Sequence, residues 1–161
     1  MEHESEVKHK HSVHFSSEDM THATPWPFYK ALDDEFNFTI DVCAEAHNAK
    51  CERYYSPEDD GLKQEWSGVC WMNPPYGREI GKWMKKAHIS AQNGATVVCL
   101  IPSRTDTAYW HEYVMNADEV RLVKGRIKFV GSTAGAPFPS AVVVFRPGEP
   151  RRQFTAMSIA A

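Results

Sequence analysis

Apolar residues recur at helical spacing in one long segment in the middle of the chain. Five of them hold positions i, i+3, i+4, i+7 and i+11: Ile80, Trp83, Met84, Ala87 and Ala91. Such a continuous apolar face is typical of an amphipathic helix that packs on a core. Gly94, a residue type common at helix ends, follows this segment. The pattern predicts a helix over 79–93.

Shorter segments carry patterns typical of strands. Residues 95–101 form an apolar run that suits a central strand covered on both faces. Further strands are predicted at 38–43, 68–72, 119–123, 126–130 and 140–145. Two more helices are predicted, one with Thr24 as N-cap and Pro25 at its first position, and one over 107–116. Strands alternating with helices favour an α/β fold, with a mostly parallel sheet that ends in a C-terminal antiparallel hairpin.

The two ends of the chain lack these patterns. Residues 1–20 are rich in Glu, Lys, Ser and His and have little to bury, so we expect a disordered N-terminal arm. His9, His11 and His14 could bind a metal, but we interpret them as incidental histidines of a flexible tail. We expect a single domain over 21–148, without repeats, and a loose tail over 149–161.

Composition narrows the class of protein further. The chain has 161 residues and 42% hydrophobic residues, enough for one buried core. No apolar run approaches the roughly 18 residues of a membrane helix, and the charged start is no signal peptide, so we expect a cytoplasmic protein. The four cysteines lack metal-ligand spacing, so no metal is expected. A net charge of −3 means that nucleic acid would have to be met by local basic patches.

A candidate reactive loop, Asn73-Pro74-Pro75-Tyr76, follows the predicted strand 68–72. Open α/β sheets bind ligands beyond the carboxyl ends of their strands. The side-chain oxygen of Asn73 and the carbonyl of Pro74 can hold the N–H groups of an exocyclic amine and so localise its lone pair. Consecutive prolines fix φ, and Tyr76 offers a face for an extruded base. The alternative interpretation is a stiff turn with a buried Tyr.

Seven motifs, in order, resemble those of the small phage-type (Dam-like) DNA N6-adenine methyltransferases, over about residues 22–147. They are Thr24-Pro25, Phe38-Thr39-Ile40-Asp41-Val42-Cys43-Ala44, Asn48-Ala49-Lys50-Cys51, Asp59-Asp60-Gly61-Leu62 with Trp66, Asn73-Pro74-Pro75-Tyr76-Gly77, Gly125-Arg126-Ile127-Lys128-Phe129 and Ala136-Pro137-Phe138-Pro139-Ser140. The resemblance implies a Rossmann-like fold, S-adenosylmethionine as cofactor, and methylation of adenine N6 in double-stranded DNA. It also implies a phage or prophage origin.

The resemblance also implies which residues hold the cofactor. Asp41 would face the sulfonium or the α-ammonium group, although capping of the next turn is a rival role. Thr24-Pro25 resembles a Thr-Pro segment that lies against the methionine part. Asp60 resembles the carboxylate that binds the cofactor's adenine amine, with Asp59 as the alternative.

Three further features bear on the cofactor. Glu45 or Glu52 could hold the ribose hydroxyls, but solvation is the favoured role for both. The family's usual Gly-rich turn is missing after Asp41, which leaves the binding of the carboxylate open. His22 stands where the phage-type group usually has an aromatic residue, which would weaken packing on the cofactor or make it sensitive to pH.

DNA contact requires a flipped base, because a stacked base cannot reach such a pocket. Lys124, Arg126 and Lys128 alternate on one face of the predicted C-terminal hairpin and are the candidate DNA-binding residues. Solvation is the favoured role for the helix lysines Lys82, Lys85 and Lys86. The Gly-rich loop 131–135 is a candidate lid.

Other functions stay open at this stage. The same loop occurs in enzymes that methylate cytosine N4, RNA or a protein glutamine, and a non-catalytic binding module with this fold is a further alternative. Intact Asn73 and Asp41 argue against the last. Neither the recognition sequence nor the oligomeric state is predicted.

Overall fold

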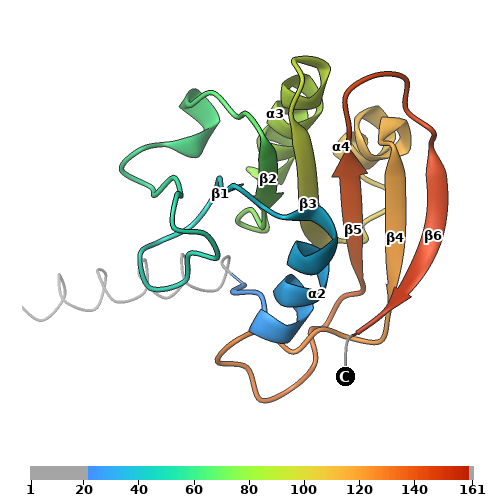
Figure 1. Ribbon diagram of the computed structural model, residues 1–161. Coiled ribbons are helices and arrows are strands. Elements are labelled where there is room, and N and C mark those ends of the chain that lie inside the picture. The colour runs from blue at the N-terminus through green and yellow to red at the C-terminus, as the bar shows by residue number, and fades with distance from the viewer. Residues whose placement is uncertain (1–21, 160–161) are drawn as a thin grey trace, which may run out of the picture.

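The computed structural model describes residues 22–159, so the predicted arm over 1–20 lies outside the described residues (Figure 1). The helices are α2 (Trp26–Phe36), α3 (Ile80–Gln92) and α4 (Ala108–Glu112), with the 3-10 helices η1 (Gly61–Lys63) and η2 (Val114–Asn116). The strands are β1 (Ile40–Asp41), β2 (Val69–Met72), β3 (Thr96–Pro102), β4 (Glu119–Lys124), β5 (Ser140–Phe145) and β6 (Gln153–Ser158).

The six strands form one mixed sheet in the order β1-β2-β3-β5-β4-β6. The pairs β1–β2, β2–β3 and β4–β6 are parallel, whereas β5 is antiparallel to both β3 and β4. The carboxyl ends of every strand but β5 therefore lie at one edge of the sheet, together with the amino end of β5. This edge is where an open α/β sheet places a ligand.

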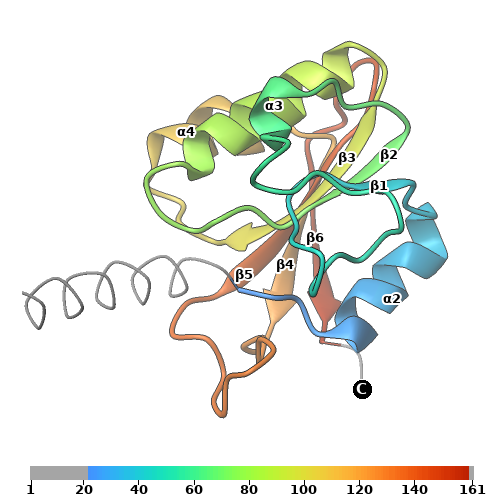
Figure 2. The same ribbon diagram turned by 90° about the vertical axis from the view of Figure 1, so that its left-hand side faces the viewer.

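Helices cover both faces of the sheet, α2 on one side and α3 with α4 on the other (Figure 2). The predicted apolar face of α3 is confirmed, since its five residues are buried: Ile80, Trp83, Met84, Ala87 and Ala91. On the opposite face, Tyr29 of α2 packs edge-on against Trp71 of β2, with ring centroids 5.4 Å apart. The sheet between them is apolar, and every residue of β5 is buried.

Two of the four cysteines lie on central strands and are buried. Cys70 on β2 and Cys99 on β3 are both fully excluded from solvent, and neither forms a disulfide. Burial raises the pKa of the Cys70 thiol to about 12. Both side chains therefore act as small hydrophobic residues of the core.

The predicted strand over 126–130 is wrong, whereas the neighbouring strands β4 and β5 do form an antiparallel pair, joined by a long connection. Gly125, with a φ of +87°, turns the chain out of the sheet, and 126–130 continues as part of a long connection to β5. Ile127 and Phe129 are buried as the alternating pattern suggested, because they anchor this connection to the core. Both edges of β4 are already occupied, by β5 and β6.

The predicted loose tail over 149–161 is also wrong, because Gln153–Ser158 forms β6. This strand pairs with β4 along its whole length, from Glu119↔Gln153 to Lys124↔Ser158. Most of its side chains are exposed, so it carries little apolar signal. Its backbone hydrogen bonds and one ion pair hold it in place.

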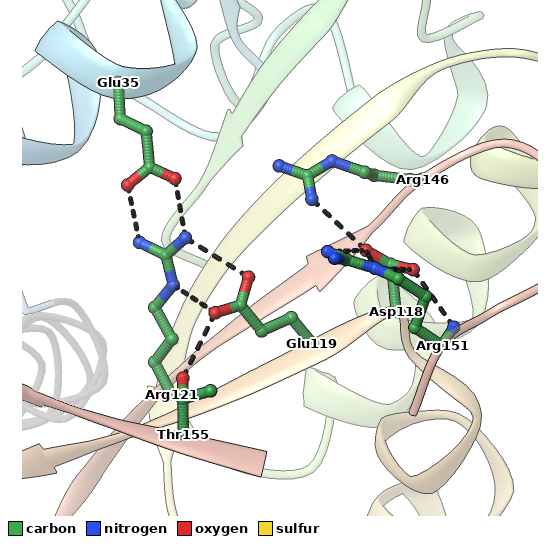
Figure 3. Close-up of polar contacts among 7 residues, drawn as sticks. All are labelled: Glu35, Asp118, Glu119, Arg121, Arg146, Arg151 and Thr155. Carbon is green, nitrogen blue, oxygen red and sulfur yellow. Dashed lines mark hydrogen bonds and ion pairs between the residues drawn. The ribbon is translucent and has the colours of Figure 1, made fainter. Parts of the chain in front are cut away.

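That ion pair joins Asp118 to Arg151, just before β6 (Figure 3). The Asp118 carboxylate accepts hydrogen bonds from the Arg151 backbone and guanidinium and from Arg146. These bonds hold the pKa of Asp118 below its usual range, with the Arg151 bond as the main cause. The tail is therefore fixed to the sheet at the point where β6 begins.

A second charged cluster in Figure 3 ties α2 to the same end of the sheet. Arg121 of β4 donates two hydrogen bonds to Glu35 of α2, at 2.8 and 2.6 Å, and another to Glu119 at 2.9 Å. Thr155 of β6 donates to Glu119 at 3.1 Å. Arg121 thus links β4 to α2, and Glu119 links β4 to β6. Within residues 22–159, no helix is long and apolar enough to cross a membrane.

Candidate active site

A pocket of about 220 Å³ lies beyond the carboxyl ends of β1 and β2. Three segments far apart in the sequence form its walls: 22–24, 41–61 and the loop that follows β2. It brings together six of the residues predicted from the sequence: Thr24, Asp41, Asp60, Asn73, Pro74 and Pro75. Of the other predicted residues, Pro25 is the N-cap of α2 and Tyr76 is buried outside the pocket lining. The three basic residues also lie outside the lining.

The side chain of Asn73 is held in one orientation by its hydrogen bonds. Its Nδ2 donates to the backbone carbonyl of His22 and, at 3.0 Å, to Oγ1 of Thr24. Its Oδ1 accepts a hydrogen bond from the hydroxyl of Tyr76 at 2.9 Å. An amide oxygen has two lone pairs, so one acceptor position on Oδ1 remains for a further N–H group.

Thr24 differs from the sequence prediction. The N-cap of α2 is Pro25, and no side chain caps this helix. Thr24 is 1% exposed, and its hydroxyl serves as a partner of Asn73 across 49 residues of sequence. Its contribution to the pocket is to orient Asn73.

Tyr76 is 6% exposed and fixed at its hydroxyl, which lies 3.1 Å from the Leu100 carbonyl as well as close to Asn73. Burial raises the pKa of Tyr76 well above its usual value, so the phenol stays protonated and can donate. The imidazole of His22 stacks on its ring, with centroids 4.8 Å apart and an interplanar angle of 17°. Phe129 and Phe138 meet the His22 ring edge-on.

Asp41 ends β1 and is 2% exposed. Its two carboxylate oxygens accept hydrogen bonds from the backbone N–H groups of Cys43 (3.2 Å) and Lys50 (3.0 Å). The rival role suggested by the sequence, capping of the following turn, is thus present in the structure. Burial raises the pKa of Asp41 from 3.8 to about 6, although both backbone hydrogen bonds lower it.

Asp60, rather than Asp59, faces the pocket. Asp59 accepts hydrogen bonds from the backbone and hydroxyl of Ser56 and closes a turn. Asp60 lines the pocket and has a left-handed backbone, with a φ of 55°. Gly61 follows it under close packing, because a Cβ there would lie 2.3 Å from the carbonyl oxygen of Val42.

The pocket also contains residues that the sequence reasoning did not single out. They include Lys50, Tyr55, Trp71 and Trp83. Lys50 lies over the ring of Trp26, with Nζ 4.3 Å from the centroid, and burial lowers its pKa. In the sequence, only its place in the motif Asn48-Ala49-Lys50-Cys51 indicated that Lys50 belongs to the site. Glu45 lines the pocket and Glu52 does not.

The three candidate DNA-binding residues do not lie on one strand. Lys124 ends β4, whereas Arg126 and Lys128 belong to the connection that follows, and all three are exposed. Arg126 donates a hydrogen bond to the carbonyl of Ala136 and so closes this connection on itself. Among the described residues, no three His, Cys, Asp or Glu side chains are grouped to hold a metal ion.

The fold and the pocket define an α/β protein with a pocket at the carboxyl ends of parallel strands, where open α/β sheets bind their ligands. The family model for DNA N-6-adenine-methyltransferase (Dam) matches residues 11–161. The chain is 33% identical, over 137 residues, to the DNA N-6-adenine-methyltransferase of Haemophilus phage HP1, an alignment that covers 80% of this chain and 79% of the phage protein. The chain therefore belongs to the DNA N-6-adenine-methyltransferase (Dam) family, whose members are enzymes.

Other similar proteins were found. The DNA N-6-adenine-methyltransferase of Escherichia phage T1 is 33% identical over 101 residues, covering 61% of this chain and 42% of that protein. The solved M protein of the type I restriction enzyme EcoKI has a TM-score of 0.45 and 12% identity, covering 70% of this chain and 29% of that one. A predicted O-methyltransferase from Agrobacterium tumefaciens has a TM-score of 0.40 and 15% identity, covering 74% and 77%.

Proposed function

We propose that this protein transfers a methyl group from S-adenosylmethionine to adenine N6 in double-stranded DNA, and that the loop Asn73-Pro74-Pro75-Tyr76 binds the reacting amine. One observation carries the proposal: an Asn73 amide of fixed orientation opens into the same pocket as the carboxylates of Asp41 and Asp60. Membership of the family supports adenine in DNA as the substrate.

The pocket fits the cofactor in the chemistry of its side chains. S-adenosylmethionine has a cationic sulfonium, an ammonium group, a carboxylate, a ribose and an adenine. The Asp41 carboxylate suits the cationic part, and the ammonium group of Lys50 suits the carboxylate. The carboxylate of Asp60 can accept from the adenine amine, and the ring of Trp83 offers an apolar surface. Close packing of Gly61 on Val42 keeps the wall that carries Asp60 in place.

The chain activates the amine through hydrogen bonds rather than through a base. Adenine N6 is a weak nucleophile, because its lone pair is delocalised into the ring. The free acceptor position of Asn73 Oδ1 and the carbonyl of Pro74 can hold its two N–H groups, which favours a localised lone pair on nitrogen. When bound, the cofactor would supply a methyl group on a positively charged sulfur. The sulfur is a good leaving group, because it departs as a neutral thioether. Pro74 and Pro75 fix φ, so the two acceptors are positioned before the amine arrives.

DNA must present the base outside the double helix, because a base stacked in a duplex cannot enter a pocket. Unstacking costs a few kcal/mol, which aromatic stacking on the protein repays in part. The ring of Tyr76 is the candidate stacking surface. Lys124 at the end of β4 and Lys128 in the connection that carries Phe129 are exposed, and there they can meet phosphates.

The substrate is tested by incubating the protein with S-adenosylmethionine labelled on its methyl group. Unmethylated duplex DNA, RNA and total protein are offered separately, and each is then digested and analysed. We expect the label in N6-methyldeoxyadenosine from DNA. Label in N4-methyldeoxycytidine, in RNA or in glutamine would replace the substrate, and label in none of them would refute the proposed activity.

A further inference from the structure

The imidazole of His22 fills a recess between aromatic rings. It stacks on Tyr76, and the edges of Phe129 and Phe138 lie against it with centroids at 5.0 and 5.6 Å. Tyr76 and Phe129 are almost fully buried. A planar ring in this recess thus gains one stacked contact and two edge contacts, both favourable geometries for aromatic groups.

Tyr76 itself is fixed, so its stacked partner is the ring that can be exchanged. The Tyr76 hydroxyl is bonded to Asn73 and lies within hydrogen-bonding distance of Leu100 in the centre of β3. Phe129 and Phe138 approach the Tyr76 ring only edge-on, at 6.1 and 5.6 Å. Among the described residues, only His22 covers a face of Tyr76 in a stacked arrangement.

The backbone of residues 22 and 23 is hydrogen-bonded to two other parts of the chain. The His22 carbonyl accepts from Asn73 Nδ2, and the Ala23 carbonyl accepts from the backbone N–H of Val130 at 3.0 Å. Val130 is 62% exposed and belongs to the connection between β4 and β5. Movement of His22 out of the recess would therefore also affect Asn73 and this connection.

We propose that the His22 imidazole is a displaceable plug of the target-base recess: adenine stacks on Tyr76 only after His22 has left it. This inference rests on the proposed function, which requires a base beside Asn73. The imidazole is a planar nitrogen heterocycle, as a nucleobase is, and it occupies the one stacked position that the recess offers.

A plug must be displaced when DNA binds, so it weakens binding of the flipped base without taking part in methyl transfer. We expect His22→Ala to lower KM for unmethylated duplex DNA by about 3- to 10-fold, with kcat unchanged or higher. His22→Trp, a larger ring that stacks better, raises KM. His47→Ala is the matched control, because His47 is exposed and lies outside the pocket lining.

If His22 were instead a wall of the base site, His22→Ala would raise KM. An increase in KM, or no change, overturns the inference. Because the alanine variant keeps the backbone bonds of residues 22–24, its loss of fold is not expected, and a thermal melt equal to that of the unaltered protein checks this.

Displacement is also visible without turnover. Proton resonances of the His22 ring, identified by their loss in His22→Ala, are shifted upfield by the face of Tyr76. Duplex DNA added with S-adenosylhomocysteine is expected to move them toward the values of an exposed histidine. Methylation by the unaltered protein with unmoved His22 resonances overturns the inference alone, whereas no methylation of DNA overturns the proposed function and the inference together.

Discussion

Asn73 has contacts that a carboxylate could not make. Its Nδ2 donates to the His22 carbonyl and to Thr24, both on a segment 49 or more residues away in sequence. Aspartate at this position would offer two acceptor oxygens to an amine but would repel the His22 carbonyl. The amide at position 73 therefore binds residues 22–24 of the pocket wall and also offers the acceptor that the proposed chemistry needs.

The buried carboxyl of Asp41 makes the free energy of unfolding depend on pH. Burial raises the pKa of this carboxyl from 3.8 to about 6 in the folded protein. The folded state thus binds the proton more tightly than the unfolded state does. The stabilising contribution is complete below pH 3.8 and is lost as the pH rises through about 6, by roughly 3 kcal/mol at most.

Urea unfolding of the unaltered protein and of Asp41→Asn at pH 4 to 7 measures this contribution. Other ionisable groups are common to the two proteins, so the difference between their free energies of unfolding isolates Asp41. We expect the difference to shift in favour of the asparagine variant as the pH rises. A difference that does not vary with pH would show that Asp41 titrates alike in both states.

Gly61 gives a second test at this scale, because it supports the wall that carries Asp60. A Cβ on Gly61 would lie 2.3 Å from the Val42 carbonyl oxygen, which cannot yield without moving backbone. We expect Gly61→Ala to weaken binding of S-adenosylhomocysteine at least tenfold and to cost about 1–3 kcal/mol of stability. Titration calorimetry and urea unfolding measure the two effects.

The matched control for this substitution is Gly81→Ala in α3. Its added Cβ would meet Tyr109 at an ordinary 3.7 Å, and alanine is favoured over glycine within a helix. The control should keep both ligand affinity and stability. Equal affinities for the two variants would mean that segment 56–61 does not shape the ligand site.

At the scale of elements, the neighbouring side chains of Arg121 and Glu119 on β4 connect this strand to α2 and to β6. Arg121 is 15% exposed at its side chain, and Glu119, one of its two carboxylate partners, is 12% exposed. Hydrogen bonds to Arg121 hold the pKa of both Glu35 and Glu119 below the usual range. Arg121→Ala leaves the Glu119 carboxylate nearly buried without its main partner, for an expected loss of about 2–4 kcal/mol in urea unfolding.

Lys30→Ala provides the comparison for Arg121→Ala. It breaks the Lys30–Asp34 ion pair of α2, the helix that also carries Glu35, and both side chains of this pair are at least 69% exposed. An exposed pair contributes little, so we expect a change within about 0.5 kcal/mol. Similar losses for the two variants would contradict a structural role for the Arg121 cluster.

Sequence patterns predicted the elements whose apolar residues face a core. The helix over 79–93, the central strand over 95–101 and the strand over 140–145 are confirmed within a residue or two, because periodic burial determines each of them. The alternation in 126–130 misled, since Ile127 and Phe129 are buried in a connection without strand pairing. β6 was missed, because contacts to β4 and Asp118 define it rather than its own apolar residues.

The candidate site shows the same division. Motifs predicted that Thr24, Asp41, Asp60 and Asn73 belong together, and the pocket contains all four. The sequence could not show that Thr24 binds Asn73 instead of capping α2, since that contact depends on tertiary structure. For the same reason it could not show His22 stacked on Tyr76.

At the scale of the whole molecule, the net charge of −3 makes DNA a partner that only part of the surface can accept. Lys124 at the end of β4 and Arg126 and Lys128 in the connection that follows are all exposed. The pocket, the aromatic recess and these basic residues all lie at the edge where the parallel strands end. This common location is what a single DNA-modifying site requires.

The central claim is that Asn73 takes part in methylation of adenine N6, and one measurement tests it most directly. N6-methyldeoxyadenosine is quantified by mass spectrometry in unmethylated duplex DNA after incubation with S-adenosylmethionine and the unaltered protein, Asn73→Ala, or Asn93→Ala, an exposed asparagine at the end of α3. We predict N6-methyldeoxyadenosine with the unaltered protein and Asn93→Ala, and a loss of at least 100-fold with Asn73→Ala, which still binds S-adenosylhomocysteine. Undiminished methylation by Asn73→Ala, or no N6-methyldeoxyadenosine from the unaltered protein, would contradict the claim.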